Sequence, residues 1–198
     1  TGSNMGAADV LETYSVYARA YTSSAENKQV ELSRILIKFP VDDITSDRSS
    51  GIIPASGNVN FYLKLYNAET SKTVPERYTL TVQPVSQSWQ EGTGLDLENY
   101  LDYTVGNTGS DWIQRTKDAG GSVLNWANAG GDYLTASNYD QLFESGLENM
   151  EVDVTILMEE WLGGVYSNYG FGIALSASQE ITASYNLTGA ANSFYTKR

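Results

Sequence analysis

The sequence contains neither cysteine nor histidine. Without these residues the chain has no Ser-His-Asp or Cys-His nucleophile, no thiolate chemistry and no ordinary zinc site. Catalysis would have to rely on paired carboxylates, lysines, tyrosines, or a bound magnesium or calcium ion. The lack of cysteine also excludes disulfide bonds. It says little about compartment, because many bacterial and viral extracellular proteins contain no cysteine.

Positive charge and long apolar runs are scarce as well. The chain has 12 Lys and Arg against 24 Asp and Glu, so its net charge is −12. Such an acidic surface repels phosphate backbones, and we expect no nucleic-acid partner. No apolar run approaches the length of a transmembrane helix, and the first residues lack the basic and apolar regions of a signal peptide. We therefore expect no membrane insertion.

Both ends of the sequence indicate a processed or truncated polypeptide. It begins TGSNMG without an initiator Met, and it ends SFYTKR, which resembles the start of a strand. We expect the natural polypeptide to continue beyond Arg198. No Pro-rich linker, low-complexity run or internal repeat divides the chain, so we interpret residues 1–198 as a single domain.

Alternation of apolar and polar residues dominates the sequence and predicts β-strands. It is clearest where Phe61, Leu63 and Leu65 alternate with Tyr62 and Lys64. The predicted strands are residues 14–22, 30–39, 59–66, 78–85, 152–154, 169–175 and 181–187. Within 30–39, the spacing of Ile35, Ile37 and Phe39 predicts a central strand.

One short helix is predicted, over residues 155–163. Thr155 is the expected N-cap and Gly163 the expected end, while Ile156, Leu157 and Trp161 form the expected apolar side.

The middle of the chain, residues 86–140, has many turn signals and few alternating runs. We expect a long central insertion loop that folds back on the domain. Its expected aromatic anchors are Trp89, Trp112, Trp126, Tyr133 and Tyr139. The strands, the single short helix and the long connections favour an all-β fold, an antiparallel two-sheet sandwich of jelly-roll type.

Several segments, taken in order, resemble the DNRLRE family of β-sandwich modules, which occur in bacterial surface proteins and some phage particles. SRILIKF followed by NFYLKLYN is similar to the opening of the family. SWQEG matches its Trp-Glu-Gly element, NWANAGGD its Asn-Trp and Gly-Gly-Asp elements, and VDVTILMEEWLGG with NYGFGIAL its closing part. Residues in this pattern include Trp89, Gly92, Trp126, Gly131, Trp161 and Phe171.

This resemblance covers roughly residues 10–188, and the long run 95–116 is similar to virion structural proteins of marine tailed phages. It implies a non-enzymatic structural protein of a phage particle or similar extracellular assembly: a capsid decoration, fibre or appendage component. The expected location is the virion, and the expected partners are copies of the same chain and other virion or surface proteins. The family supplies no catalytic residues.

Trp89 lies two residues before Glu91 and supports a competing interpretation. Aromatic rings stack on sugars, so Trp89 or Trp112 would be the platform of a carbohydrate-binding surface module, with Glu91 beside it. A glycoside-processing enzyme would need a second carboxylate across a cleft, and no paired-carboxylate motif is present. We favour a structural corner, in which Trp89 plugs the end of the sandwich and Gly92 permits a tight turn.

Four carboxylates near this corner are candidate calcium ligands: Glu91, Asp96, Glu98 and Asp102. They do not follow the Asp-x-Asp-x-Asp-Gly loop pattern, so no metal site is assigned and calcium stays an alternative.

Other polar residues have structural or interface interpretations. Tyr62 and Tyr66 occupy the polar face of their strand and are candidate contacts between copies. Arg34 or Lys38, within a core-like strand, is expected to meet a carboxylate beneath a loop. The pair 159–160 is expected to lie on a solvated helix face.

Overall fold

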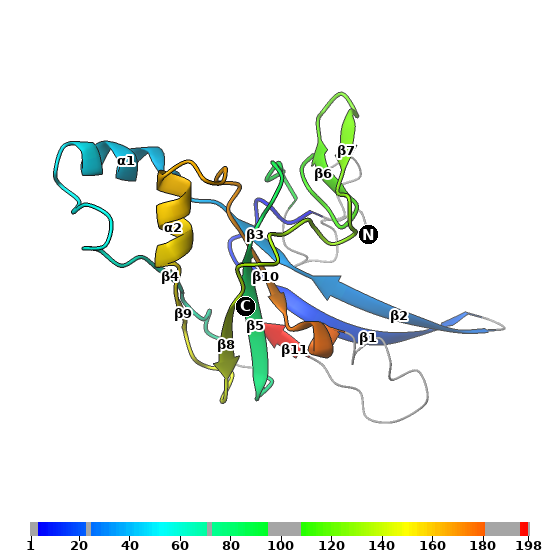
Figure 1. Cartoon of the computed structure of the whole chain (residues 1–198). Helices are drawn as coiled ribbons and strands as arrows, with labels where there is room; N and C mark the ends of the chain where they lie inside the picture. The colour runs from blue at the N-terminus through cyan, green and yellow to red at the C-terminus, as the bar shows by residue number, and fades with distance from the viewer. Residues whose placement is uncertain (1–3, 23–24, 71–72, 95–107, 181–194, 198) are drawn as a thin grey trace.

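A computed structural model describes residues 4–22, 25–70, 73–94, 108–180 and 195–197. These residues form mostly short antiparallel strands with few short helices (Figure 1), which confirms the all-β prediction. The strand predicted at 181–187 lies outside them. The jelly-roll arrangement and the long insertion loop stay predictions.

The chain order of the elements is as follows. The first half contains β1 (Thr13–Thr22), β2 (Ala25–Ser33), β3 (Ile35–Ile37), α1 (Asp42–Ser49), β4 (Tyr62–Leu65) and β5 (Tyr78–Pro84). The second half contains β6 (Gln114–Lys117), β7 (Val123–Asn125), β8 (Tyr139–Phe143), β9 (Met150–Asp153), α2 (Thr155–Leu162), β10 (Phe171–Leu175) and β11 (Tyr195–Lys197).

These strands form four antiparallel sheets. The largest has the order β3-β10-β5-β8, and a second has the order β11-β1-β2. The pairs β4-β9 and β6-β7 complete the set. In Figure 1 the β1–β2 ribbon extends away from the body of the protein, and α2 stands at the end of the β4–β9 pair.

The hydrophobic core lies between the four-stranded sheet, the β4–β9 pair and α2. On β5 the predicted alternation is present, since Tyr78, Leu80 and Val82 are buried and the residues between them are not. The β4–β9 pair contributes Leu63 and Val152 to the same core. Burial of this apolar surface is the main driving force for folding. Further core residues are Phe143, Met150, Leu157, Met158, Trp161, Phe171, Ile173 and Leu175.

Two predictions about the helices were wrong. Helix α1 was not predicted, because its sequence DDITSDRS has one apolar residue, Ile44, and no fully buried one. Ile44 packs partly buried against the core, while Asp42 and Asp43 in the first turn and Arg48 in the last complement the helix dipole. In α2, the N-cap is Val154 and Thr155 is already helical, while Ile156 is 74% exposed and faces away from the core.

The predicted strand 30–39 is divided in two. β2 ends at Ser33 and β3 begins at Ile35, and the two strands belong to different sheets. β3 is an edge strand rather than a central one, and Phe39 is 43% exposed beyond its end. The break falls at Arg34, whose side chain leaves the strand to form the contacts described below.

In the middle of the chain the described residues contain a β-hairpin. β6 and β7 pair antiparallel, with an irregularity in register between Gln114 and Thr116. The hairpin is attached to the preceding segment by backbone bonds from Gln90 N to Arg115 O and from Gly109 N to Lys117 O. Part of this region is therefore ordered by local pairing.

Candidate functional site

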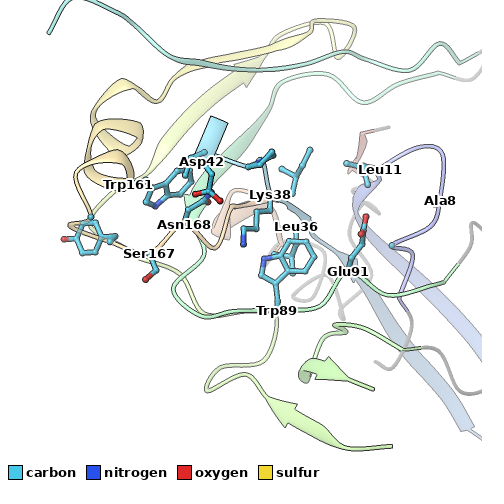
Figure 2. Close-up of a pocket in the computed structure, with 16 residues that line it drawn as sticks. Ala8, Leu11, Leu36, Lys38, Asp42, Trp89, Glu91, Trp161, Ser167 and Asn168 are labelled. Atoms are coloured by element: carbon cyan, nitrogen blue, oxygen red, sulfur yellow. The ribbon is translucent and has the colours of Figure 1, made fainter. Parts of the chain in front are cut away.

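A groove of about 1040 Å³ lies beside β3 and is a candidate site. Trp89 and Glu91, which are close in sequence, both line it (Figure 2). Its remaining wall comes from three separate chain segments and from Trp161 of α2. The lining also includes Gly6, Ala8, Leu11, Leu36, Ile37, Lys38, Pro40, Val41, Asp42, Trp161, Gly164, Tyr166, Ser167 and Asn168.

Trp89 is positioned by the end of β5. After Pro84 the chain leaves the sheet, and the backbone of Ser86 donates to Asp132 O at 2.9 Å. The indole Nε1 of Trp89 then donates to Tyr169 O at 2.7 Å. Because this bond satisfies the polar atom of the ring, its remaining contribution to the groove is apolar surface suited to stacking.

Glu91 belongs to a backbone corner that holds the N-terminal segment. Its carbonyl accepts a 2.7 Å bond from Asn4 Nδ2, and Asn4 Oδ1 accepts from Gly94 N at 3.2 Å. Gly92 has φ +92°, and a Cβ there would lie 2.3 Å from Thr108 O. The corner therefore requires glycine at 92. In Figure 2 the exposed Glu91 side chain points toward Leu11.

The groove contains charges of both signs. Figure 2 shows the ammonium end of Lys38 directed toward Trp89, with Asp42 on one side of this pair and Glu91 on the other. Asn168 is less available, since its Nδ2 donates to Phe39 O at 2.8 Å and its Oδ1 accepts from Gly170 N at 2.9 Å. The groove thus offers donors, acceptors and aromatic surface together.

Trp112 lies elsewhere, in a separate cluster around Arg34. The Arg34 guanidinium lies 4.8 Å from the Trp112 ring and 6.0 Å from the Tyr133 ring. It donates to Glu180 at 3.0 and 2.7 Å and to Gly130 O at 2.9 Å. This confirms the prediction that one of the two cations Arg34 and Lys38 meets a carboxylate. Trp89 and Trp112 therefore do not form one platform.

The NWANAGGD segment is a structural loop organised by Asp132. Its carboxylate accepts bonds from Ala127 N at 2.7 Å, Asn128 N at 2.9 Å, Asn128 Nδ2 at 2.8 Å and Gln87 Nε2 at 2.8 Å. Burial alone would raise the pKa of Asp132, but these bonds outweigh it and hold the pKa below its usual value. Trp126 Nε1 donates to Asp111 O at 3.0 Å, and Gly131 has φ +111° against the Tyr133 ring.

The remaining residues of the sequence pattern lie in the core. The rings of Trp161 and Phe171 are 4.9 Å apart, and both residues are buried. Trp161 also lines the inner wall of the groove, which connects the core to the candidate site.

The calcium alternative falls mostly outside the described residues. Asp96, Glu98 and Asp102 belong to the segment 95–107, which the structure does not describe. Within the described ranges no three acidic side chains gather as a metal site would require, and no helix there is long and apolar enough to cross a membrane.

Of the predicted interface tyrosines, Tyr62 begins β4 on the outer face of the β4–β9 pair, and Tyr66 directly follows the last residue of β4. Tyr66 is 79% exposed and Tyr62 is 47% exposed. Between them, Lys64 contacts Glu151 at 3.0 Å and lies 5.8 Å from the Tyr62 ring. Glu159, predicted to be solvated, instead bonds Arg48 at 2.7 and 2.8 Å, which joins α1 to α2.

Asp42 and Asn168 are among the groove residues that the sequence did not indicate as part of a site. Asp42 begins the unpredicted polar helix α1, and Asn168 precedes β10. The antiparallel pairing of β3 with β10 brings both chain segments to the groove. No local sequence signal reports that long-range pairing.

No family model, curated protein or solved structure matches this chain. The DNRLRE resemblance therefore stays a prediction.

Proposed function

We propose that this chain is a non-enzymatic structural protein of a phage particle or a similar extracellular assembly. Its partners in this proposal are copies of itself and other proteins of the particle, and the jelly-roll sandwich belongs to the same proposal. The DNRLRE resemblance of residues 10–188 is one support. The observation that carries it is the outer face of β4–β9.

That face combines a fixed backbone with exposed aromatic rings. The inner side of the pair is anchored in the core through Leu63 and Val152, which are 4% and 7% exposed. The outer side presents Tyr62 beside the Lys64–Glu151 ion pair, and the exposed Tyr66 directly follows β4. Tyrosine supplies contact area with little loss of side-chain entropy and is enriched at interfaces, so a rigid tyrosine face suits subunit contacts.

The test is incorporation into particles. A tagged chain is expressed in cells that produce the particle, and its amount per purified particle is measured by mass spectrometry. Replacing Tyr62 and Tyr66 by Ser should lower incorporation about tenfold, which corresponds to the loss of about 1.4 kcal/mol. Val165→Ser, which removes an exposed apolar side chain elsewhere, is the matched control and should leave incorporation unchanged.

Absence of the untagged chain from purified particles and from any extracellular assembly would contradict the proposal. If the tyrosine variant and the control are incorporated equally, Tyr62 and Tyr66 do not form a contact in the assembly.

The second candidate is a carbohydrate-binding surface module, favoured by the groove at Trp89. Its aromatic surface lies beside hydrogen-bonding groups of Lys38 and Asp42. Affinity electrophoresis in gels with neutral polysaccharides tests it. Retardation lost in Trp89→Ala but kept in Trp112→Ala would support this function, because Trp112 lies in the Arg34 cluster. No retardation of the unaltered chain on any polysaccharide would count against it.

A further inference from the structure

The hydrogen-bond pattern of the four-stranded sheet fixes which backbone groups of β3 are paired. Val85 N donates to Gly170 O at 2.9 Å, and Ser176 N donates to Thr79 O at 2.9 Å. In an antiparallel ladder, directly opposed residues alternate between pairs that exchange hydrogen bonds and pairs that do not. Gly172 therefore bonds to β5, and its neighbours Phe171 and Ile173 direct their backbone groups to the other side of β10.

β3 lies on that other side of β10. Phe171 is opposite Ile37, and Ile173 is opposite Ile35. These two pairs therefore exchange the hydrogen bonds between the strands. Leu36 lies between them, so its N–H and C=O point away from β10, toward the free edge of the sheet.

The groove runs along this edge. Leu36, Ile37 and Lys38 form one wall, and Gly6, Ala8 and Leu11 of the N-terminal segment line it as well. Among the described strands, none pairs with β3 on this side. An unpaired strand edge next to a groove has the geometry of a site for strand addition, in which backbone bonds hold an extended peptide.

Two features set the extent of such a site. Pro40 has no N–H, so an added strand could pair only before it. Lysine on an edge strand commonly discourages pairing. Here, however, Lys38 directly follows β3, and Figure 2 shows its side chain directed toward Trp89.

The side chains of the groove define the peptide that fits. Trp89 and Leu11 offer apolar contacts, which suit an apolar side chain. Asp42 and Glu91 place two carboxylates against the single ammonium of Lys38, in a chain of net charge −12. This balance favours a basic side chain on the peptide and disfavours an acidic one.

We propose that the free edge of β3 binds one extended segment of a neighbouring subunit, with an apolar side chain against Trp89 and a basic side chain near Asp42 or Glu91. This inference rests on the proposed structural function and names how one contact of the assembly is made. The added segment becomes a fifth strand of the sheet, outside β3.

The first test needs no ligand. Hydrogen exchange of the isotope-labelled chain is followed by NMR at single amides. The Leu36 amide should exchange at least about tenfold faster than those of Ile35 and Ile37, since only its N–H faces the free edge. Equal protection of all three amides would overturn the proposal.

The second test uses the synthetic peptide KVTVTVK, acetylated and amidated. Titration should shift the amide signals of Leu36 and Lys38 and the indole signal of Trp89. The same peptide with N-methyl groups on all its valine and threonine amides removes the bonds in either register, and it should bind about tenfold more weakly, because each lost backbone bond is worth about 1 kcal/mol. Glu in place of Lys in the peptide should also weaken binding, and the difference should shrink at high salt.

Variants of the chain give the matched comparison. Leu36→Pro removes the outward N–H while leaving the bonds to β10 in place, and an edge strand tolerates proline. It should lower peptide affinity about tenfold, whereas Leu36→Ala, which keeps the N–H, should change it about threefold or less. Circular dichroism checks that both variants fold.

Strand addition would be overturned by the peptide titration alone in two cases: if the N-methylated peptide binds as tightly as the parent peptide, or if neither peptide binds. Neither result bears on whether the chain is present in particles, so failure here is separate from failure of the proposed function.

Discussion

The guanidinium of Arg34 and the carboxylate of Glu180 form a two-point ion pair, with N···O distances of 3.0 and 2.7 Å. The pair joins the break between β2 and β3 to the segment after β10. The same guanidinium bonds Gly130 O and lies over the Trp112 ring, so one side chain ties the β6–β7 region to the large sheet. The side chains of Arg34 and Glu180 are 22% and 13% exposed, which limits solvent screening.

Arg34→Lys should lower the free energy of unfolding by about 2 kcal/mol. Lysine keeps the charge but lacks the planar fork that bonds Glu180 at two points and the flat surface that lies over Trp112. Urea unfolding followed by tryptophan fluorescence measures the loss. Lys64→Gln is the control: its ion pair with Glu151 is half-exposed, and its removal should cost about 0.5 kcal/mol or less. Similar losses in the two variants would contradict this role of Arg34.

Asp132→Asn should destabilise the chain by about 2 kcal/mol near neutral pH, because an amide cannot accept all the bonds that the carboxylate receives. Asp140→Asn is the control, since Asp140 is exposed and accepts one bond from Thr81 Oγ1. Its effect should stay within about 0.5 kcal/mol.

The Asp132 effect should also depend on pH. Its pKa is lowered in the folded chain, so the unfolded chain binds more protons as acid is added. The stabilisation is complete above the unfolded pKa of about 3.9 and is lost as pH falls through the lower folded value. The stability difference between the parent chain and Asp132→Asn should therefore shrink below about pH 4. Unfolding curves over a pH series measure it, and a constant difference would argue against the lowered pKa.

The sequence predicted those parts of the fold that depend on local alternation. β4, β5 and β10 lie within predicted strands, because burial on one sheet face imposes a period of two on their residues. Helix α1 contacts the core only through the partly buried Ile44, and one residue makes no apolar period. The break falls at Arg34, whose ion-pair partner Glu180 is distant in sequence, so the alternation of 30–39 resembles one strand.

The candidate site was predictable only where its residues are neighbours in sequence. Trp89 and Glu91 were identified together because only Gln90 lies between them in the sequence. Lys38 was recognised as a cation in a core-like strand, but its place beside Trp89 depends on how the chain returns after β5. Asp42 and Asn168 meet the groove through the β3–β10 pairing, which no local pattern reports.

Gly92→Ala should destabilise the corner that contains Glu91. The φ of +92° is unfavourable for alanine, and the added Cβ would also overlap Thr108 O and Asn4 Oδ1. We expect a loss of about 3 kcal/mol, the sum of backbone strain and overpacking. The amide of Ala7, which donates to Gly94 O, should exchange faster as the N-terminal segment is released.

Gly57→Ala separates the two causes. Gly57 has φ +83°, but a Cβ there meets nothing within 4 Å. This variant should therefore show only the backbone strain, about 1 kcal/mol. If both alanine variants lose equal stability, close packing at the Glu91 corner does not contribute.

Leu157→Ala and Ile156→Ala test which side of α2 faces the core. Leu157 is fully buried with Met158 and Trp161, whereas its neighbour Ile156 is 74% exposed. Leu157→Ala should cost about 3 kcal/mol through lost burial and a residual cavity, and Ile156→Ala about 0.5 kcal/mol or less. Chemical unfolding of both variants gives the comparison. Because the two positions are adjacent and both become alanine, helix propensity nearly cancels and the difference reports packing alone. A larger loss at 156 would mean that α2 is rotated, which would also move Trp161 out of the wall of the groove.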